Sequence, residues 1–229
     1  SLRTAATRIT VPSPWHAELR KLKAEQFAID GTRKETEKSH VSPYLLGKII
    51  SKELKKQDIF SVDCGFNLTW MVQSYLAKGA EQRFISAWGC SPMGYAIPAA
   101  IGAWYARPRA TVVCVIGDGG TQMNIQEFQT LAYNKIPVKV FILNNHSYAT
   151  IRFPTRKEFD GRTFGTEPST GYAAPDFTAI AKAYGLPVVR LENNEKLALK
   201  VKKILKKKGP VIVEVNTDPE QGIIERLKF

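Results

Sequence analysis

Residues 112–145 of this chain read VVCVIGDGGTQMNIQEFQTLAYNKIPVKVFILNN. Two runs, Thr111–Ile116 and Val138–Leu143, bound this stretch, and both are apolar apart from Thr111 and Lys139; such runs are typical of strands that are buried on both faces of a sheet. A helical segment over about 124–134 separates them. Strand, helix and strand in this order predict two parallel strands joined by a crossover helix.

The alternation of strands and helices continues on both sides of this stretch. Ser42 is a plausible N-cap and Pro43 suits the first helical position. Further strands are predicted over residues 59–62, 84–87, 188–191 and 211–215, and further helices over 94–105, 176–184 and about 196–208. The sequence therefore predicts an α/β fold, a doubly wound parallel sheet with helices on both faces.

Two regions fall outside this pattern. Residues 1–38 are polar, with a charged stretch over 15–27 that is compatible with a short helix, and we interpret them as a linker or the end of a preceding domain. Residues 39–229 are predicted to form the α/β domain. Residues 146–174 show no clear periodicity and predict a long functional loop, because compact domains rarely contain structureless stretches of this length.

The formal net charge of +12 raises the question of nucleic-acid binding. Much of the charge comes from lysines between residues 196 and 208, where Leu197, Val201 and Ile204 recur at helical spacing. This pattern predicts a helix with one apolar and one solvated basic face. No nucleic-acid-binding motif accompanies it, so we expect no nucleic-acid partner.

Membrane and disulfide classes are disfavoured by composition. No run of 18 apolar residues exists, so we expect no membrane partner. The three cysteines, Cys64, Cys90 and Cys114, lack CxxC spacing, which argues against a disulfide framework and a zinc site. A reducing cytoplasmic location is expected.

Two polar motifs occupy the predicted carboxyl edge of the sheet, where ligands of such folds bind. Gly117-Asp118-Gly119-Gly120 follows one buried strand, and Asn144-Asn145 ends the next, with Asn145 27 positions after Asp118. Glycines allow close approach to a phosphate, and carboxylate and amide oxygens suit Mg²⁺. A tight turn without a ligand, and a purely structural role for the asparagines, are the alternatives.

Three segments in the same order resemble thiamine diphosphate (ThDP) enzymes of the acetolactate synthase branch. Residues 117–145 resemble the GDG…NN signature, the SPMGYAIPAAIGA segment resembles the same branch, and DCGFN occupies the position of a DVGQH-like diphosphate contact. The resemblance covers roughly residues 40–217 and implies the diphosphate-binding module of the ThDP-binding fold, with ThDP and Mg²⁺ as cofactors.

The resemblance also implies a role for each matching residue. Asp118, the side chain of Asn145 and the backbone carbonyl of Ser147 would ligate Mg²⁺. Met93 would bend the cofactor, although packing at a helix start is an alternative for this residue. The implied cofactor-binding set is Phe66, Asn67, Ser91, Met93, Gly117, Asp118, Gly119, Gly120, Asn145 and Ser147.

The implied activity is decarboxylation of a 2-oxo acid and ligation of the carbanion to a carbonyl acceptor. The alternatives are a non-catalytic binding or assembly module and a different ThDP decarboxylase or lyase. No catalytic residue is expected in this chain, because the family's glutamate lies in a pyrimidine-binding domain. The implied partners are that domain, from the same or a partner chain, and further copies in a homodimer or tetramer, with the isolated domain inactive.

Two departures from the family pattern leave the substrates open. Asn67 stands where histidine is frequent. The stretch after the NN motif differs from that of biosynthetic acetolactate synthases. Its Arg152, Arg156 and Lys157 suit either contact with an anionic substrate or an ordinary exposed role.

Overall fold

The structure is a computed structural model that describes residues 13–28 and 36–224. Contacts divide the chain into one unit of residues 1–30 and a second of residues 31–229. The first unit contains helix α1 (Ser13–Ala28), as its charged stretch predicts. The boundary near residue 38 stays a prediction, and residues 1–12 and 29–35, on which it partly depends, lie outside the described part.

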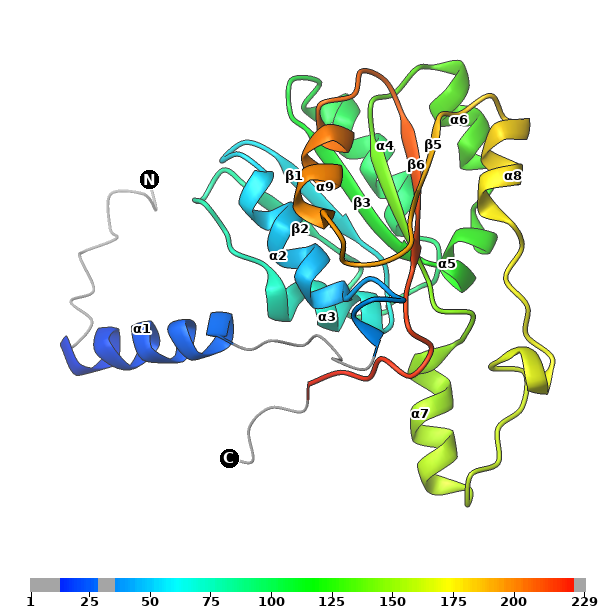
Figure 1. The fold of residues 1–229 in the computed structure, drawn as a ribbon. Helices are drawn as coiled ribbons and strands as arrows, with labels where there is room; N and C mark the ends of the chain where they lie inside the picture. The colour runs from blue at the N-terminus through cyan, green and yellow to red at the C-terminus, as the bar shows by residue number, and fades with distance from the viewer. Residues whose placement is uncertain (1–12, 29–35, 225–229) are drawn as a thin grey trace. The chain divides into compact units, whose positions relative to one another are not determined.

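The second unit is built on a six-stranded sheet in which every pair of neighbours is parallel (Figure 1). The strand order is β2-β1-β3-β4-β6-β5. The strands are β1 (Ile59–Val62), β2 (Arg83–Ile85), β3 (Val112–Gly117), β4 (Lys139–Asn144), β5 (Val188–Leu191) and β6 (Val211–Asn216). Strands β3 and β4, which flank the predicted helical segment 124–134, are direct neighbours as predicted.

Helices cover both faces of this sheet (Figure 1). Side chains that alternate along β3 belong to two separate cores, with Val113 and Val115 in one and Cys114 and Ile116 in the other. The first core is completed by α2 (Pro43–Glu53), α3 (Phe66–Ser74) and α9 (Leu197–Leu205), and the second by α4 (Ala96–Ala106), α6 (Glu127–Tyr133) and α8 (Phe177–Ala183). The doubly wound α/β fold is therefore confirmed.

Helix ends follow the expected capping chemistry. The Ser42 hydroxyl accepts a hydrogen bond from the backbone N–H of Leu45 at 3.3 Å, at the start of α2. The Asp176 carboxylate accepts from the N–H groups of Thr178 and Ala179, and so caps α8. These side chains satisfy N–H groups that have no partner within the helix.

The prediction of a structureless loop over residues 146–174 is wrong. Helix α7 (Ala149–Glu158) lies inside it, followed by a short 3₁₀ turn over Pro168–Thr170. The helix escapes detection because Arg152 stands on its buried face, while the apolar Ile151 is exposed. Apolar periodicity is the signal that predicts a helix, and here a buried cation interrupts it.

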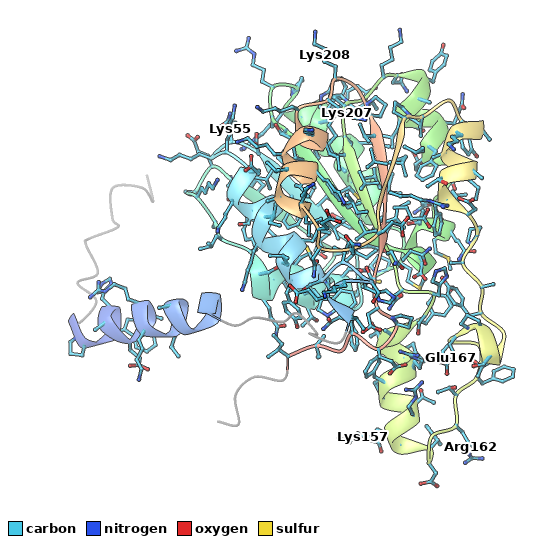
Figure 2. All side chains as sticks on the ribbon, viewed as in Figure 1. Lys55, Lys157, Arg162, Glu167, Lys207 and Lys208 are labelled. Carbon is cyan, nitrogen blue, oxygen red and sulfur yellow. The ribbon has the colours of Figure 1, made fainter. Side chains whose placement is uncertain are left out.

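The basic residues near the C-terminus form the predicted helix face. Leu197, Val201 and Ile204 are buried along α9, whereas Lys202 and Lys203 are exposed. Figure 2 shows Lys55, Lys207 and Lys208 at the end of this unit opposite to Lys157, Arg162 and Glu167. Among the described residues no helix is long and apolar enough to cross a membrane.

Candidate functional site

Asp118 and Asn145 meet at the carboxyl edge of β3 and β4. Gly117 pairs with Leu143 in the sheet register, so the two residues lie just beyond the ends of adjacent strands. The backbone N–H of Ser147 donates to Asp118 Oδ2 at 3.2 Å and to Asn145 Oδ1 at 3.3 Å. One N–H group therefore brings a carboxylate oxygen and an amide oxygen together.

The Asp118 carboxylate is buried, with 3% of the residue exposed. Burial raises its pKa to about 6, although hydrogen bonds from Gly119 N–H, the Tyr172 hydroxyl and Ser147 N–H oppose the shift. A buried carboxylate without a cationic partner is unfavourable, and a divalent cation would supply the missing charge. Among the described residues no group of three or more His, Cys, Asp or Glu side chains is arranged to hold a metal ion. Backbone and phosphate oxygens would therefore have to complete such a site.

The glycines at the end of β3 and in the first turn of helix α5 (Asp118–Met123) lie where an added side chain would meet neighbouring protein atoms. A Cβ at Gly120 would lie 2.1 Å from Asp63 Oδ2, and one at Gly119 would lie 2.1 Å from the ring of Tyr148. A Cβ at Gly117 would lie 2.8 Å from Asn67 Nδ2. Close packing against the protein's own side chains therefore requires glycine at these positions, whether or not the motif also binds a phosphate.

Asp63 is a second buried carboxylate beside this turn, and the sequence analysis did not select it. Its Oδ2 accepts from Gly94 N–H at 3.0 Å and its Oδ1 accepts from Ala96 N–H at 3.2 Å. Burial raises its pKa, while these backbone hydrogen bonds oppose the rise. Asp63 thus ties the end of β1 to the segment that carries Ser91 and Met93.

Helix α3, which the sequence analysis did not predict, brings residues 66 and 67 to the same edge. Phe66 N–H donates to Thr150 Oγ1 at 3.0 Å, which joins the start of α3 to α7. The Asn67 amide donates to the Cys64 carbonyl at 3.1 Å, so it stabilises the turn between β1 and α3.

A cavity of about 290 Å³ lies among these elements. Its lining includes buried Trp70 and half-buried Tyr148, and also Met93, which is 37% exposed and so is not core packing. The structure brings all ten predicted residues to this one cavity: Phe66, Asn67, Ser91, Met93, Gly117, Asp118, Gly119, Gly120, Asn145 and Ser147.

Two tyrosines complete the polar edge of the site, and no motif pointed to them. The rings of Tyr148 and Tyr172 lie 4.2 Å apart at an interplanar angle of 46°. Burial and the nearby Asp118 charge raise the pKa of both hydroxyls, so both stay protonated near neutral pH. Tyr172 comes from a segment distant in sequence, which is why spacing could not identify it.

The residues present fit a diphosphate held through a divalent cation. Hard oxygen donors from Asp118 and Asn145 converge on the backbone N–H of Ser147, at the edge of the cavity that the neighbouring glycines also line. Phe66, Trp70 and Met93 add an apolar and aromatic part to the cavity wall. Such a wall suits an organic ring attached to the charged group.

Comparisons with known proteins agree with this geometry. The family model described as "Thiamine pyrophosphate enzyme, C-terminal TPP binding domain" matches residues 63–215. Acetolactate synthase 2, chloroplastic, from Zea mays is 33% identical over 214 residues, covering 92% of this chain and 33% of that protein. The acetolactate synthase large subunit of Lactococcus lactis is 34% identical over 190 residues, covering 83% of this chain and 32% of that protein.

The chain spans about a third of the length of the curated relatives it matches. The matched region contains strands β3 and β4 and the whole interval from Gly117 to Asn145. Thiamine diphosphate is the cofactor that this family implies, with Mg²⁺ as its usual partner. The chain belongs to the thiamine pyrophosphate enzymes, and it contains the C-terminal TPP-binding domain of an acetolactate synthase-like member.

Proposed function

We propose that this domain holds the diphosphate of ThDP through Mg²⁺ at the β3–β4 edge. Asp118, the Asn145 side chain and the Ser147 carbonyl are the proposed metal ligands. The proposed contacts to the remainder of the cofactor come from the glycine turn, from the start of α3 and from the segment before α4: Gly117, Gly119, Gly120, Phe66, Asn67, Ser91 and Met93.

One observation carries this proposal. The N–H of Ser147 is shared between Asp118 Oδ2 and Asn145 Oδ1, at 3.2 and 3.3 Å. Two oxygens that approach the same nitrogen are also close enough to approach the same cation. Both residues are at least 95% buried, so water competes weakly for that position.

The proposed reaction is decarboxylation of a 2-oxo acid, followed by joining of the remaining fragment to a carbonyl acceptor. The bound cofactor supplies the electron sink for the carbon that loses carbon dioxide. The chain supplies position and exclusion of water. Met93 and Trp70 line the apolar part of the cavity, and the metal ligands fix its charged end.

A second domain is part of the proposed enzyme. The glutamate that acts on the pyrimidine ring of the cofactor would come from a pyrimidine-binding domain of the same or a partner chain, in a homodimer or tetramer. Residues 39–229 would be inactive without it. Three cysteines without a disulfide, Cys64, Cys90 and Cys114, suit a reducing compartment, and a cytoplasmic location is part of the proposal.

Calorimetric titration of ThDP, with and without Mg²⁺, tests the cofactor site. Wild type should bind ThDP only when Mg²⁺ is present, and Asp118→Asn should lower the affinity by at least about 100-fold. Asp160→Asn makes the same chemical change at an exposed carboxylate and should bind like wild type. Equal affinities for wild type and Asp118→Asn would overturn the metal assignment.

Carbon dioxide release tests the reaction. The enzyme that combines this domain with its pyrimidine-binding domain should release carbon dioxide from at least one member of a panel of 2-oxo acids. The acceptor is then identified from the product formed with a panel of aldehydes and 2-oxo acids. Tight cofactor binding without turnover of any donor would favour a non-catalytic binding or assembly module.

A further inference from the structure

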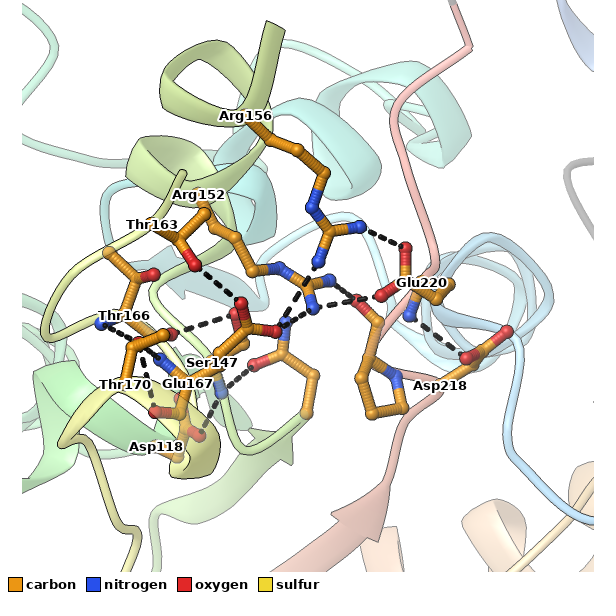
Figure 3. A network of polar contacts seen from close by, with 12 residues as sticks. Asp118, Ser147, Arg152, Arg156, Thr163, Thr166, Glu167, Thr170, Asp218 and Glu220 are labelled. Atoms are coloured by element: carbon orange, nitrogen blue, oxygen red, sulfur yellow. Dashed lines mark hydrogen bonds and ion pairs between the residues drawn. The ribbon is translucent and has the colours of Figure 1, made fainter. Parts of the chain in front are cut away.

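A buried arginine on α7 connects three segments beside the cofactor site (Figure 3). Arg152 is 2% exposed, and its NH1 lies 2.9 Å from Glu167 Oε2 and 2.8 Å from Glu220 Oε1. Its NH2 donates to the Pro219 carbonyl. Arg152 therefore joins α7, the loop before the 3₁₀ turn, and the segment that follows β6. Its two terminal nitrogens contact these protein groups, while its buried Nε has no hydrogen-bond partner among the described residues.

Glu167 organises the loop in which it lies. Its Oε1 accepts from the Thr163 hydroxyl at 2.8 Å, while its Oε2 accepts from Arg152. Glu167 and Thr170 form a reciprocal capping box around the 3₁₀ turn. The Arg152 contact is the main cause that lowers the pKa of Glu167, so the carboxylate is charged at neutral pH.

The loop that Glu167 holds makes direct contact with the backbone after Asn145. The carbonyl of Thr166, next to Glu167 in sequence, accepts from Ser147 Oγ at 3.0 Å and from Tyr148 N–H at 2.9 Å. The N–H of Ser147 points the other way, to Asp118 and Asn145. Ser147 is thus held from two sides, by the site residues and by the loop (Figure 3).

Stability alone is a weak reason for this buried pair. Removing two charges from water is unfavourable, and apolar replacements of similar volume are frequently as stable. A buried, hydrogen-bonded ion pair does fix the relative position of the segments it joins. Metal sites demand such accuracy, because ligand distances must be correct to about 0.2 Å.

We propose that Arg152 and Glu167 are a positioning pair for the metal site. The pair fixes the 163–170 loop, whose Thr166 carbonyl sets the backbone at Ser147 and so the direction of the Ser147 carbonyl. This inference rests on the proposed function, in which that carbonyl is the third Mg²⁺ ligand. Neither residue touches the cofactor in this arrangement.

Mg²⁺ titration by calorimetry at saturating ThDP tests the pair in the purified protein. Glu167→Gln keeps the shape of the side chain but removes its charge, and it should raise the Kd for Mg²⁺ by about 10-fold or more. Arg152→Met, an apolar replacement of similar length, should raise the Kd similarly and serves if Glu167→Gln does not fold.

Two matched controls separate positioning from general destabilisation. Arg156→Gln removes a half-exposed charge that contacts the same Glu167, at 3.4 Å, and leaves both members of the Arg152–Glu167 pair in place. Val201→Ala opens a gap in the α9 core, away from the network, and lowers the melting temperature. Both should keep the Kd for Mg²⁺ within about twofold of wild type. Loss of a contact that supports a metal ligand typically weakens metal binding by about 10- to 100-fold.

The outcomes distinguish this inference from the proposed function. Wild type that binds ThDP without any need for Mg²⁺ would overturn both. Metal-dependent wild type combined with an unchanged Kd in folded Glu167→Gln would overturn the positioning pair alone. Equal weakening by Val201→Ala and Glu167→Gln would also overturn it, since loss of stability would then explain the effect.

Discussion

The side chains of Asp118 and Asn145 are bridged by one backbone N–H group, although 26 residues separate them in the chain. The bridge exists because β3 and β4 are parallel neighbours and end at the same edge. Asn144, adjacent in sequence, points elsewhere: its amide donates to Glu214 Oε1 at 2.9 Å, and its Oδ1 accepts from His146 N–H at 3.2 Å. The two asparagines therefore have different roles.

Alanine substitution at each asparagine should separate these roles. Asn145→Ala removes an oxygen at the cavity and should weaken Mg²⁺-dependent ThDP binding by about 10- to 100-fold. Asn144→Ala breaks a buried hydrogen bond to Glu214 and should lower the free energy of unfolding by about 1 to 3 kcal/mol. Urea denaturation measures the free energy of unfolding of both variants, and calorimetry measures their affinity for ThDP in the presence of Mg²⁺. A larger binding loss for Asn144→Ala would contradict the assignment.

The sequence alone predicts the parallel sheet and the proximity of Asp118 and Asn145 at its edge. Apolar runs, interrupted only by Lys139, predict β3 and β4 because both strands are buried on two faces, and their pairing places Asp118 near Asn145. These features depend on residues close in sequence or on neighbouring strands, for which spacing is informative. At the glycine motif the structure differs from the predicted turn, because helix α5 begins at Asp118, directly after the end of β3.

Contacts between distant loops could not be predicted in the same way. Asp63 binds the N–H groups of Gly94 and Ala96, and a single carboxylate after a strand gives no sign of this. Tyr172 reaches Tyr148 only because α7 and the 163–170 loop fold back on the site. Arg152 interrupts the apolar periodicity that would predict α7. Its burial depends on Glu167 and Glu220, which lie outside this helix in the sequence.

Alanine at the glycines of the turn should show how tightly it is packed. Gly120→Ala places a methyl group 2.1 Å from the Asp63 carboxylate and should lower the free energy of unfolding by about 1 to 3 kcal/mol. Gly102, inside α4, has nothing within 4 Å of an added Cβ. Gly102→Ala should instead stabilise the protein by about 0.5 to 1 kcal/mol, because glycine is unfavourable in a helix. Chemical denaturation compares the two, and a stabilised Gly120→Ala would contradict the packing argument.

Asp63 should be required for the segment that precedes α4. Its two oxygens each accept from a backbone N–H, and Asp63→Asn replaces one acceptor with an NH₂ group that faces a donor. The expected loss is about 1 to 3 kcal/mol in the free energy of unfolding at pH 7. Hydrogen exchange should also become faster at the Gly94 and Ala96 amides. Unchanged protection of both amides would show that Asp63 does not hold this segment.

Lys139, at the opposite end of β4 from the cavity, should make stability depend on pH. Burial, reinforced by the charge of Lys207, lowers its pKa to about 8, from 10.5 in the unfolded chain. Between these values the unfolded chain keeps a proton that the folded protein has released. Stability from this group therefore rises as pH increases from about 8 to 10.5.

Lys139→Met removes the group and gives the measurement. Between pH 7 and pH 10 the wild type should gain about 1 to 2 kcal/mol of unfolding free energy relative to this variant, which is less than the full shift would give. Lys202→Met, at an exposed position of α9, should leave the difference from wild type nearly constant over the same range. Parallel stability profiles for wild type and Lys139→Met would mean that the buried ammonium keeps its ordinary pKa, through its hydrogen bonds to the carbonyls of Pro137 and Gly209.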